Sequence, residues 1–516
     1  MTDVMSRKLK SRITLTLVFV LCCVVTGVFF YAQLNLKEKN QKADLFSLVP
    51  LHAQAIIETN NINSLFQALE ATPFVDEYEQ LHFSDLFNFL NHKIDEIAEE
   101  KGHGLSVPMS NVLISFHNPG LPEDQVLYGH LGNGDRNLME DILRELSSTG
   151  YTPKEVSYKG EKIIIYPLDN GKFLACFFQQ NSYAISFQKK LIEAVIDAAT
   201  DKASIRHDSL FAKIYRQKKS ENATRLYART RPIADWTQYD LHLQGNAIYL
   251  TGLCYRAEGD KDCYYPQLAH ARVPLLSADF LPTNTYTFYQ MGIPQIQHLV
   301  DALACRDSIA GKDTLTERPL QQAFYRFVED YTRTELDIIG FRGNDSTEDH
   351  RVMLLPLRFE LSATRGAWQK IARSGWKRIW HKGQSYPIYT LPNNRLAKHL
   401  LTERAAEADK LHAILNEQYL ILSDREEDLR AYLNKRSYSE VARVAWTDYL
   451  DTLAPEANFT FFADMEDIYL HPNEFKTILP PFFFNHPKFF GDFTITLQFI
   501  EANETLNTNI TLNFKH

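Results

Sequence analysis

The sequence lacks the short motifs that identify the common catalytic sites. No G-x-S-x-G, H-E-x-x-H, Walker phosphate loop or G-x-G-x-x-G occurs in its 516 residues. The usual patterns of serine hydrolases, zinc proteases, nucleotide hydrolases and dinucleotide-binding enzymes are therefore missing. An enzyme is not excluded, since the carboxylates of many glycosidases lie in ordinary sequence. The absences favour a protein that is not an enzyme, and no cofactor is predicted.

Cysteine is scarce, with 6 residues in the chain and no C-x-x-C pair. A zinc ribbon and a thioredoxin-type redox motif are therefore excluded. Cys254 and Cys263 bracket a polar turn, so a disulfide can close that hairpin in an oxidising compartment. The alternative is two unpaired thiols near a turn.

Basic residues are outnumbered, with 55 Lys and Arg against 64 Asp and Glu, and the net charge is −9. Nucleic-acid binding calls for a basic face, so no nucleic-acid partner is predicted. The 45% apolar and 23% charged content is that of a folded globular protein. The length exceeds what one hydrophobic core normally takes up, so two or more domains are expected.

Residues 13–32 are twenty uncharged, mainly apolar residues. At about 1.5 Å per residue, a helix of this length crosses a hydrocarbon core of roughly 30 Å. Four basic residues precede it within residues 1–12, so the positive-inside rule keeps this arm cytoplasmic and exports the chain beyond residue 33. The pattern predicts a single-pass protein anchored in the lipid of a bacterial inner membrane, with a periplasmic ectodomain.

Two other N-terminal signals fit less well. A cleaved signal peptide needs small residues before the cut, where this chain has Phe29, Phe30 and Tyr31. A lipoprotein signal needs a small residue before the modified cysteine, and Cys22 follows Leu21.

The ectodomain contains an internal repeat. "YKGEKIIIYPL" returns downstream as "HKGQSYPIYTL", and Lys159-Gly160 precedes Lys382-Gly383 by 223 positions (382 minus 159). Four further pairs keep the same order at spacings of 225 to 236: Pro50 and Pro282, Phe116 and Phe341, Tyr183 and Tyr419, Ala223 and Ala457. An extra helical stretch expected at Arg395–Leu415 explains the rising spacing. Ordered blocks with a drifting register indicate duplication and a later insertion.

The expected fold class is α+β, with a single N-terminal transmembrane helix followed by two copies of an antiparallel-sheet-plus-helices domain. Period-two alternation around Asn and Gly turns predicts the hairpins, and amphipathic segments such as residues 136–146 predict the helices. The expected organisation is a basic arm (1–12), the transmembrane helix (13–32), a linker (33–44), a first repeat (45–258), a linker (259–274) and a second repeat (275–516).

The order of these blocks resembles that of a family of uncharacterised, N-terminally anchored envelope proteins of the Bacteroidetes group. Pro50 and Pro282 each open a proline, strand, polar turn and helix series, and Tyr183 and Tyr419 each open a strand-helix block. The resemblance covers most of the chain, but its motifs are structural. It implies a domain of unknown function and no catalytic residue.

Two groups of residues offer metal ligands. His399, Glu403 and Glu407 share one face of the expected inserted helix, although mixed charge on a helix is more typical of a solvated face. "GNDSTEDH" at residues 343–350 gathers oxygen ligands without the spacing of a calcium loop, and a hairpin tip explains it better. No metal residue is therefore predicted.

The most unusual composition is "PPFFFNHPKFFGDF" at residues 480–493. Its phenylalanines could form an exposed docking loop for a partner; they are Phe482, Phe483, Phe484, Phe489 and Phe490. The alternative is a loop whose rings lie inside the core.

The sequence supports two functional hypotheses. The first is an anchored periplasmic protein that binds or scaffolds an envelope component, with an envelope protein as a candidate partner. The second is a hydrolase of envelope glycan or peptide, with carboxylates in a cleft between the repeats.

Overall fold

The structure is a computed structural model that describes residues 44–515 with gaps. The gaps are residues 61, 75–111, 119–123, 133–134, 148–150, 169–170, 180, 202, 217–223, 232–233, 256–270, 298, 301–318, 334, 344–348, 402–407, 436–445, 448, 477 and 503–504. The predicted arm and transmembrane segment lie outside the described residues. Among the helices that are described, none has the length and apolar character needed to span a membrane.

The predicted fold class is wrong. The described chain is mostly antiparallel strand, with twenty strands assigned to one sheet and two short strands, β11 (Val273–Pro274) and β19 (Glu456–Ala457), forming a second. The chain divides into two compact units, but not at the predicted repeat boundary. The first takes in Met1–Leu51, Leu86–Leu113 and Gln125–Ile205, and the second takes in His52–Asp85, Ile114–Asp124 and Arg206–His516.

Pairing between distant strands explains this division. β10 (Ala247–Tyr255) pairs with β22 (Thr505–Phe514) along nine residues, from Ala247 opposite Asn513 to Tyr255 opposite Thr505. Strands from both expected copies therefore share one ladder inside the second unit. Two self-contained α+β domains would each have closed their own sheet.

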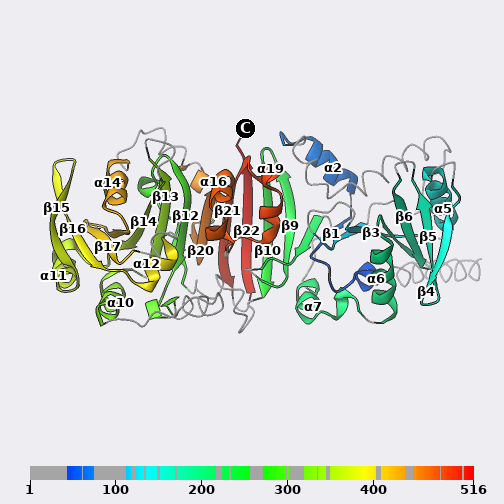
Figure 1. Ribbon diagram of the computed structural model, residues 1–516, viewed down its shortest axis with the longest axis horizontal. Helices are drawn as coiled ribbons and strands as arrows, with labels where there is room; N and C mark the ends of the chain where they lie inside the picture. Colours follow the sequence, from blue (N-terminus) through cyan, green and yellow to red (C-terminus); the bar gives the residue numbers. More distant parts are fainter. Residues whose placement is uncertain are drawn as a thin grey trace, which may run out of the picture. The chain divides into compact units, whose positions relative to one another are not determined.

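The second unit is built on fourteen strands in one antiparallel series (Figure 1). The order is β1 (Ala55–Thr59), β8 (Thr224–Ala228), β9 (Thr237–Gln244), β10, β22, β21 (Phe493–Ala502), β20 (Phe459–Asp464), β12 (Thr285–Gly292), β13 (Glu335–Arg342), β14 (Asp349–Pro356), β18 (Tyr419–Ser423), β17 (Lys410–Leu415), β16 (Gln384–Pro392) and β15 (Arg373–His381). Its helices include α2 (Ile62–Glu70), α7 (Ser209–Tyr215), α10 (Pro319–Tyr331), α11 (Leu361–Ile371), α12 (Arg395–Leu400), α14 (Glu426–Lys435), α16 (Met465–Leu470), α17 (Pro472–Phe475), α18 (Pro481–Asn485) and α19 (Pro487–Phe490).

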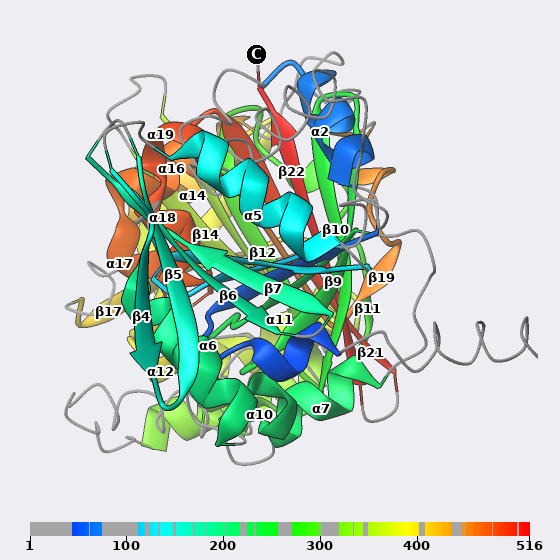
Figure 2. The same ribbon diagram turned by 90° about the vertical axis from the view of Figure 1, so that its right-hand side faces the viewer.

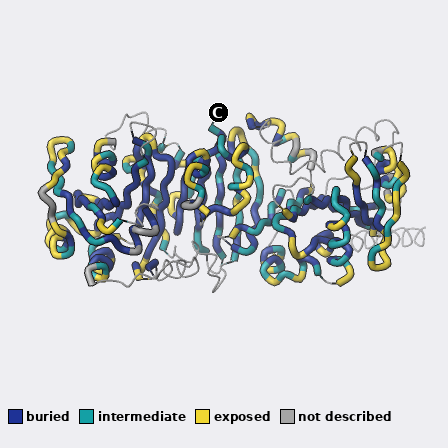
Figure 3. Tube along the Cα trace, viewed as in Figure 1, coloured by how far each residue is buried: buried dark blue, intermediate teal, exposed yellow. Residues whose placement is uncertain are grey.

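Alternate residues of these strands enter two different cores, as the pleat requires. Phe461 of β20 lies in a large cluster with residues of α10, α11 and α16–α19, whereas its neighbour Phe462 lies in a second cluster with residues of α14. Figure 3 shows the resulting runs of buried residue along these strands. The sheet is thus covered on both faces over β20 to β17, and its fourteen strands form the frame of the unit.

The first unit is smaller. Five strands pair in the order β4 (Lys154–Tyr158), β5 (Glu161–Pro167), β6 (Phe173–Gln179), β7 (Ser182–Ser186) and β3 (Gln125–His130). Helices α5 (Asp135–Leu146) and α6 (Lys189–Thr200) contact these strands (Figure 2). Strand β2 (Val112–Phe116) spans the division between the units.

The same strand orders occur twice along the chain. β4-β5-β6-β7-β3 has the order of β15-β16-β17-β18-β14, and β1-β8-β9-β10 has the order of β12-β20-β21-β22. The two "KG" turns occupy the same place in this scheme, between β4 and β5 and between β15 and β16. Lys159 and Lys382 have positive φ angles of 49° and 47°, followed by Gly160 at 85° and Gly383 at 77°. Two successive positive φ angles are the geometry of a type I′ hairpin turn.

Local predictions differ in outcome. The helix predicted at residues 136–146 is confirmed as α5. The helix expected over Arg395–Leu415 is wrong for its second part, because α12 ends at Leu400 and Lys410–Leu415 forms β17 between β16 and β18. Whether such a short apolar segment forms a helix or a strand depends on its cross-strand partners, which are not adjacent to it in sequence.

Candidate functional site

A row of nine polar residues crosses the second unit, with one residue from each of nine neighbouring strands. We call it the polar row; in strand order from β1 to β13 it comprises Glu58, Arg225, Asp240, Thr251, Asn509, Gln498, Thr460, Gln290 and Asp337. Each member is the direct cross-strand partner of the next. Their side chains therefore share one face of the sheet and stand about 5 Å apart.

The β1 end of the row is charged. The guanidinium of Arg225, with only 3% of its side chain exposed, lies 3.5 Å from Glu58 Oε2 and 3.5 Å from Asp240 Oδ1. The hydroxyl of Tyr227 donates to Glu58 Oε2 at 2.9 Å. A buried arginine between two carboxylates is a structural ion cluster, because each carboxylate already has a cation beside it.

Towards the β13 end of the row, two glutamines bond to the backbone of connecting segments that cover the sheet. Gln498 accepts from the amide of Ala454 at 2.9 Å and donates to its carbonyl at 3.1 Å. Gln290 accepts from the amide of Leu276 at 3.1 Å and donates to the carbonyl of Pro274 at 3.0 Å. Each glutamine thereby clamps a connecting segment over the face of the sheet.

Two carboxyl groups lie beside Gln290. Its amide nitrogen donates to Glu335 Oε1 at 2.7 Å, while both oxygens of Asp337 are buried without a hydrogen-bond partner among the described residues. Burial, and then the neighbouring Glu335 carboxylate, raise the pKa of Asp337 well above its usual value. Burial also raises the pKa of Glu335. The enclosed site therefore favours the neutral acid form of Asp337 over the carboxylate.

The centre of the row is open. Thr251 of β10 is exposed, and Tyr249, Asn507, Asn509 and Thr511, which share its face on β10 and β22, are half-buried. We call these five residues the central strip. The side-chain oxygen of Asn509 is buried without a hydrogen-bond partner among the described residues, at a cost of about 1–3 kcal/mol. None of the five is charged, so the strip can only donate and accept neutral hydrogen bonds.

Tyr449 borders this polar face. Its hydroxyl lies in a short contact with Thr496 Oγ1 of β21. Burial raises the pKa of Tyr449 to about 12, and contacts with Thr496, Thr494 and Asn513 oppose that rise. One end of the polar face is therefore covered by this ring.

A serine, an aspartate and a histidine meet near α14, but not as a catalytic triad. Ser423 Oγ lies 2.8 Å from Asp428 Oδ2, and His350 Nδ1 lies 2.8 Å from Asp428 Oδ1. Burial opposes ionisation of Asp428, but hydrogen bonds from His350, Arg425 and Ser423 lower its pKa. Both partners bind the carboxylate instead of each other, so the serine has no base to activate it. The group fixes α14 onto the sheet.

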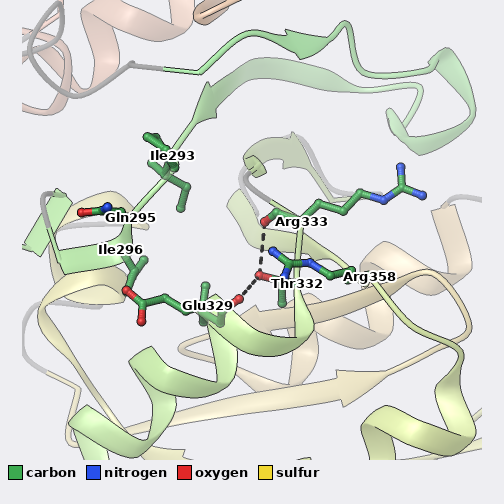
Figure 4. Close-up of a pocket in the computed structure, with 9 residues that line it drawn as sticks. Ile293, Gln295, Ile296, Glu329, Thr332, Arg333 and Arg358 are labelled. Carbon is green, nitrogen blue, oxygen red and sulfur yellow. Dashed lines mark hydrogen bonds between the residues drawn. The ribbon is translucent and has the colours of Figure 1, made fainter.

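One pocket of about 250 Å³ lies beside the end of α10 (Figure 4). It is lined by Ile293, Pro294, Gln295, Ile296, Val328, Glu329, Thr332, Arg333 and Arg358. Thr332 Oγ1 donates to the carbonyl of Val328 at 2.6 Å, so its hydroxyl proton is already committed. The pocket is smaller than those that hold most ligands, roughly 300–1,000 Å³.

The aromatic segment predicted as a docking loop folds into α18 and α19. Phe483, Phe489 and Phe490 are 5%, 2% and 3% exposed and belong to the large core, against which the half-buried Phe484 also packs. Phe482 remains 39% exposed. The placement is that of the alternative, a segment whose rings lie inside the core.

The remaining candidates fall partly outside the described residues. Cys254 is buried on β10 with its sulfur 3.9 Å from Thr508 Oγ1, whereas Cys263 is not described. The disulfide therefore stays a prediction. Of the weighed metal ligands, Glu403 and Glu407 also lie outside. Within the residues that are described, no three His, Cys, Asp or Glu side chains gather as a metal site.

The comparisons with known proteins do not assign the chain. No family model, no curated protein and no solved structure matches it. Sequence reasoning also missed the polar row, although one signal for it was present. "TLNTNITLNF" at residues 505–514 places a polar residue at every second position, which marks one polar strand face.

Proposed function

We propose that this protein is an anchored extracytoplasmic binding protein that holds a component of the cell envelope on the central strip. Residues 13–32 and the basic residues before them support an inner-membrane anchor with the described units in the periplasm. The resemblance to anchored Bacteroidetes envelope proteins agrees with this location and remains part of the proposal.

The observation that carries the proposal is the open, uncharged polar face at the centre of the second unit. It combines amide and hydroxyl groups with a tyrosine, and Thr251 at its centre is exposed. Sites that bind without catalysis need such orienting polar groups and no perturbed acid.

The alternative of a hydrolase has less support. Among the described residues, Glu335 and Asp337 are the carboxyl groups with raised pKa values. Asp337 is fully buried and Gln290 clamps a connecting segment beside it. An acid that must protonate a leaving group has to touch the substrate, and Asp337 cannot.

The test is photo-crosslinking in intact cells. A photo-reactive amino acid replaces exposed Thr251 in the strip or, as the control, Tyr151, which is 71% exposed in the first unit. After affinity purification, mass spectrometry and carbohydrate analysis identify the attached molecule. An envelope component captured from position 251 and absent from position 151 is expected. A well-expressed chain that captures nothing from position 251 contradicts the proposal.

A further inference from the structure

The composition of the central strip points to the chemistry of its ligand. None of the residues on this face of β10, β22 and β21 is charged, although 23% of the whole chain is. Asp240, the cross-strand partner of Thr251, borders the strip, but its carboxylate is already paired with Arg225. A ligand carrying phosphate, carboxylate or ammonium groups would therefore lose its hydration there without gaining an unpaired countercharge. A neutral, hydroxyl-rich ligand has no charged group whose hydration must be replaced. Charge matching therefore selects a neutral ligand.

The asparagines of β22 add an independent observation. Asn507 and Asn509 occupy alternate positions in the strip, although asparagine is among the residues depleted in strands. Threonine or valine would serve an ordinary solvent-facing strand better. Residues that break a local rule without a structural gain are expected at functional sites. An asparagine amide offers two donors and an acceptor on one rigid plane, which suits adjacent hydroxyl groups.

Tyr249 completes the arrangement. It is half-buried on β10, directly opposite Thr511 on β22, and it shares the strip's face. An aromatic ring beside planar amides presents an apolar surface next to hydrogen-bonding groups. A sugar ring has the same division, with C–H groups on its faces and hydroxyl groups around its edge.

We infer that the central strip is a binding site for a neutral polysaccharide, held by Asn507, Asn509 and Thr251 through hydrogen bonds and by Tyr249 through its ring. This inference rests on the proposed binding function and specifies its ligand. It requires no catalysis and no charged group on the ligand.

The experiment uses the full chain in mild detergent, in native gels containing either a neutral polysaccharide (dextran, mannan or xylan) or an acidic one (alginate or polygalacturonate). We expect retardation by at least one neutral polymer and by neither acidic one. The double variant Asn507→Val/Asn509→Val should bind at least about tenfold more weakly, since two amide contacts are lost. Its melting temperature should be unchanged or higher, because valine favours strands.

Asn485→Ala, at the exposed end of α18, is the matched control and should bind like the unmodified chain. Retardation by an acidic polymer alone, or a double variant that binds normally, overturns the inference. A chain that crosslinks an envelope component through position 251 but is retarded by none of the polymers overturns the polysaccharide assignment and leaves the binding function standing. A chain that does neither overturns both.

Discussion

At the β8 position of the polar row the buried residue is Arg225, held between Glu58 and Asp240. At the β20 position, which has the same place in the repeated strand order, the buried residue is Thr460, held between Gln290 and Gln498. The charged trio pairs opposite charges at 3.5 Å, whereas the glutamines of the neutral trio bond to the backbone of segments that cross the sheet. Equivalent positions of the repeated strand order can therefore hold either a charged or a neutral trio of residues. In each trio the three side chains depend on one another.

The largest effect is expected from breaking the charged set. Arg225→Thr should lower the free energy of unfolding by about 2–4 kcal/mol, because it leaves two partly buried carboxylates without their cation. The triple variant Glu58→Gln/Arg225→Thr/Asp240→Gln copies the neutral set and should recover to within about 1 kcal/mol of the original. Urea unfolding of the full chain measures both. A triple variant no more stable than Arg225→Thr would show that the two ends are not interchangeable.

The next effect is a pH dependence of stability, expected at the neutral end of the polar row because of Asp337. The folded-state pKa of Asp337 is raised, so the folded chain keeps a proton that the unfolded chain releases above about pH 4. Stability contributed by this group therefore falls as pH rises from about 4 through the folded pKa. Asp337→Asn should raise stability by about 1–3 kcal/mol at pH 8 and change it little at pH 4.

Asp428 provides the opposite control. Its pKa is lowered in the folded chain, so its stabilising contribution is present above its unfolded pKa and is lost as pH falls through the folded value. Asp428→Asn should therefore destabilise the chain at pH 8. Thermal melts across this pH range compare the two variants, and parallel curves would contradict both assignments.

The smallest effect concerns the two "KG" turns. Asparagine tolerates a positive φ better than lysine does, so Lys382→Asn should stabilise the chain by about 0.5–1 kcal/mol. Lys159→Asn should gain less, because Lys159 Nζ also pairs with Asp197 at 2.7 Å and Asp201 at 2.6 Å. Exposed ion pairs of this kind add little to stability and are screened by salt. Chemical unfolding measures the stability gain of each variant at low and at high salt. High salt screens the ion pairs of Lys159, so the two gains should be more alike there.

Local features of this fold were predictable from the sequence. The paired "KG" turns and the helix at residues 136–146 depend on residues that lie next to each other in the chain. β17 was not predictable, since "KLHAIL" becomes a strand through β16 and β18. The polar row depends on register across nine strands, and its members Asp240 and Gln498 lie 258 positions apart (498 minus 240). No local pattern encodes which of them become neighbours.

The pairing of β10 with β22 also means that β10 is synthesised long before its partner. Thr251 meets Asn509, which is made 258 residues later (509 minus 251), a delay of roughly 13 to 50 s at the usual rate of translation. During that interval β10, "AIYLTGLCY", presents an unpaired edge without a single charge to deter other chains. The absence of charge on β10 therefore makes this edge a hazard for pairing with other chains until β22 has been synthesised.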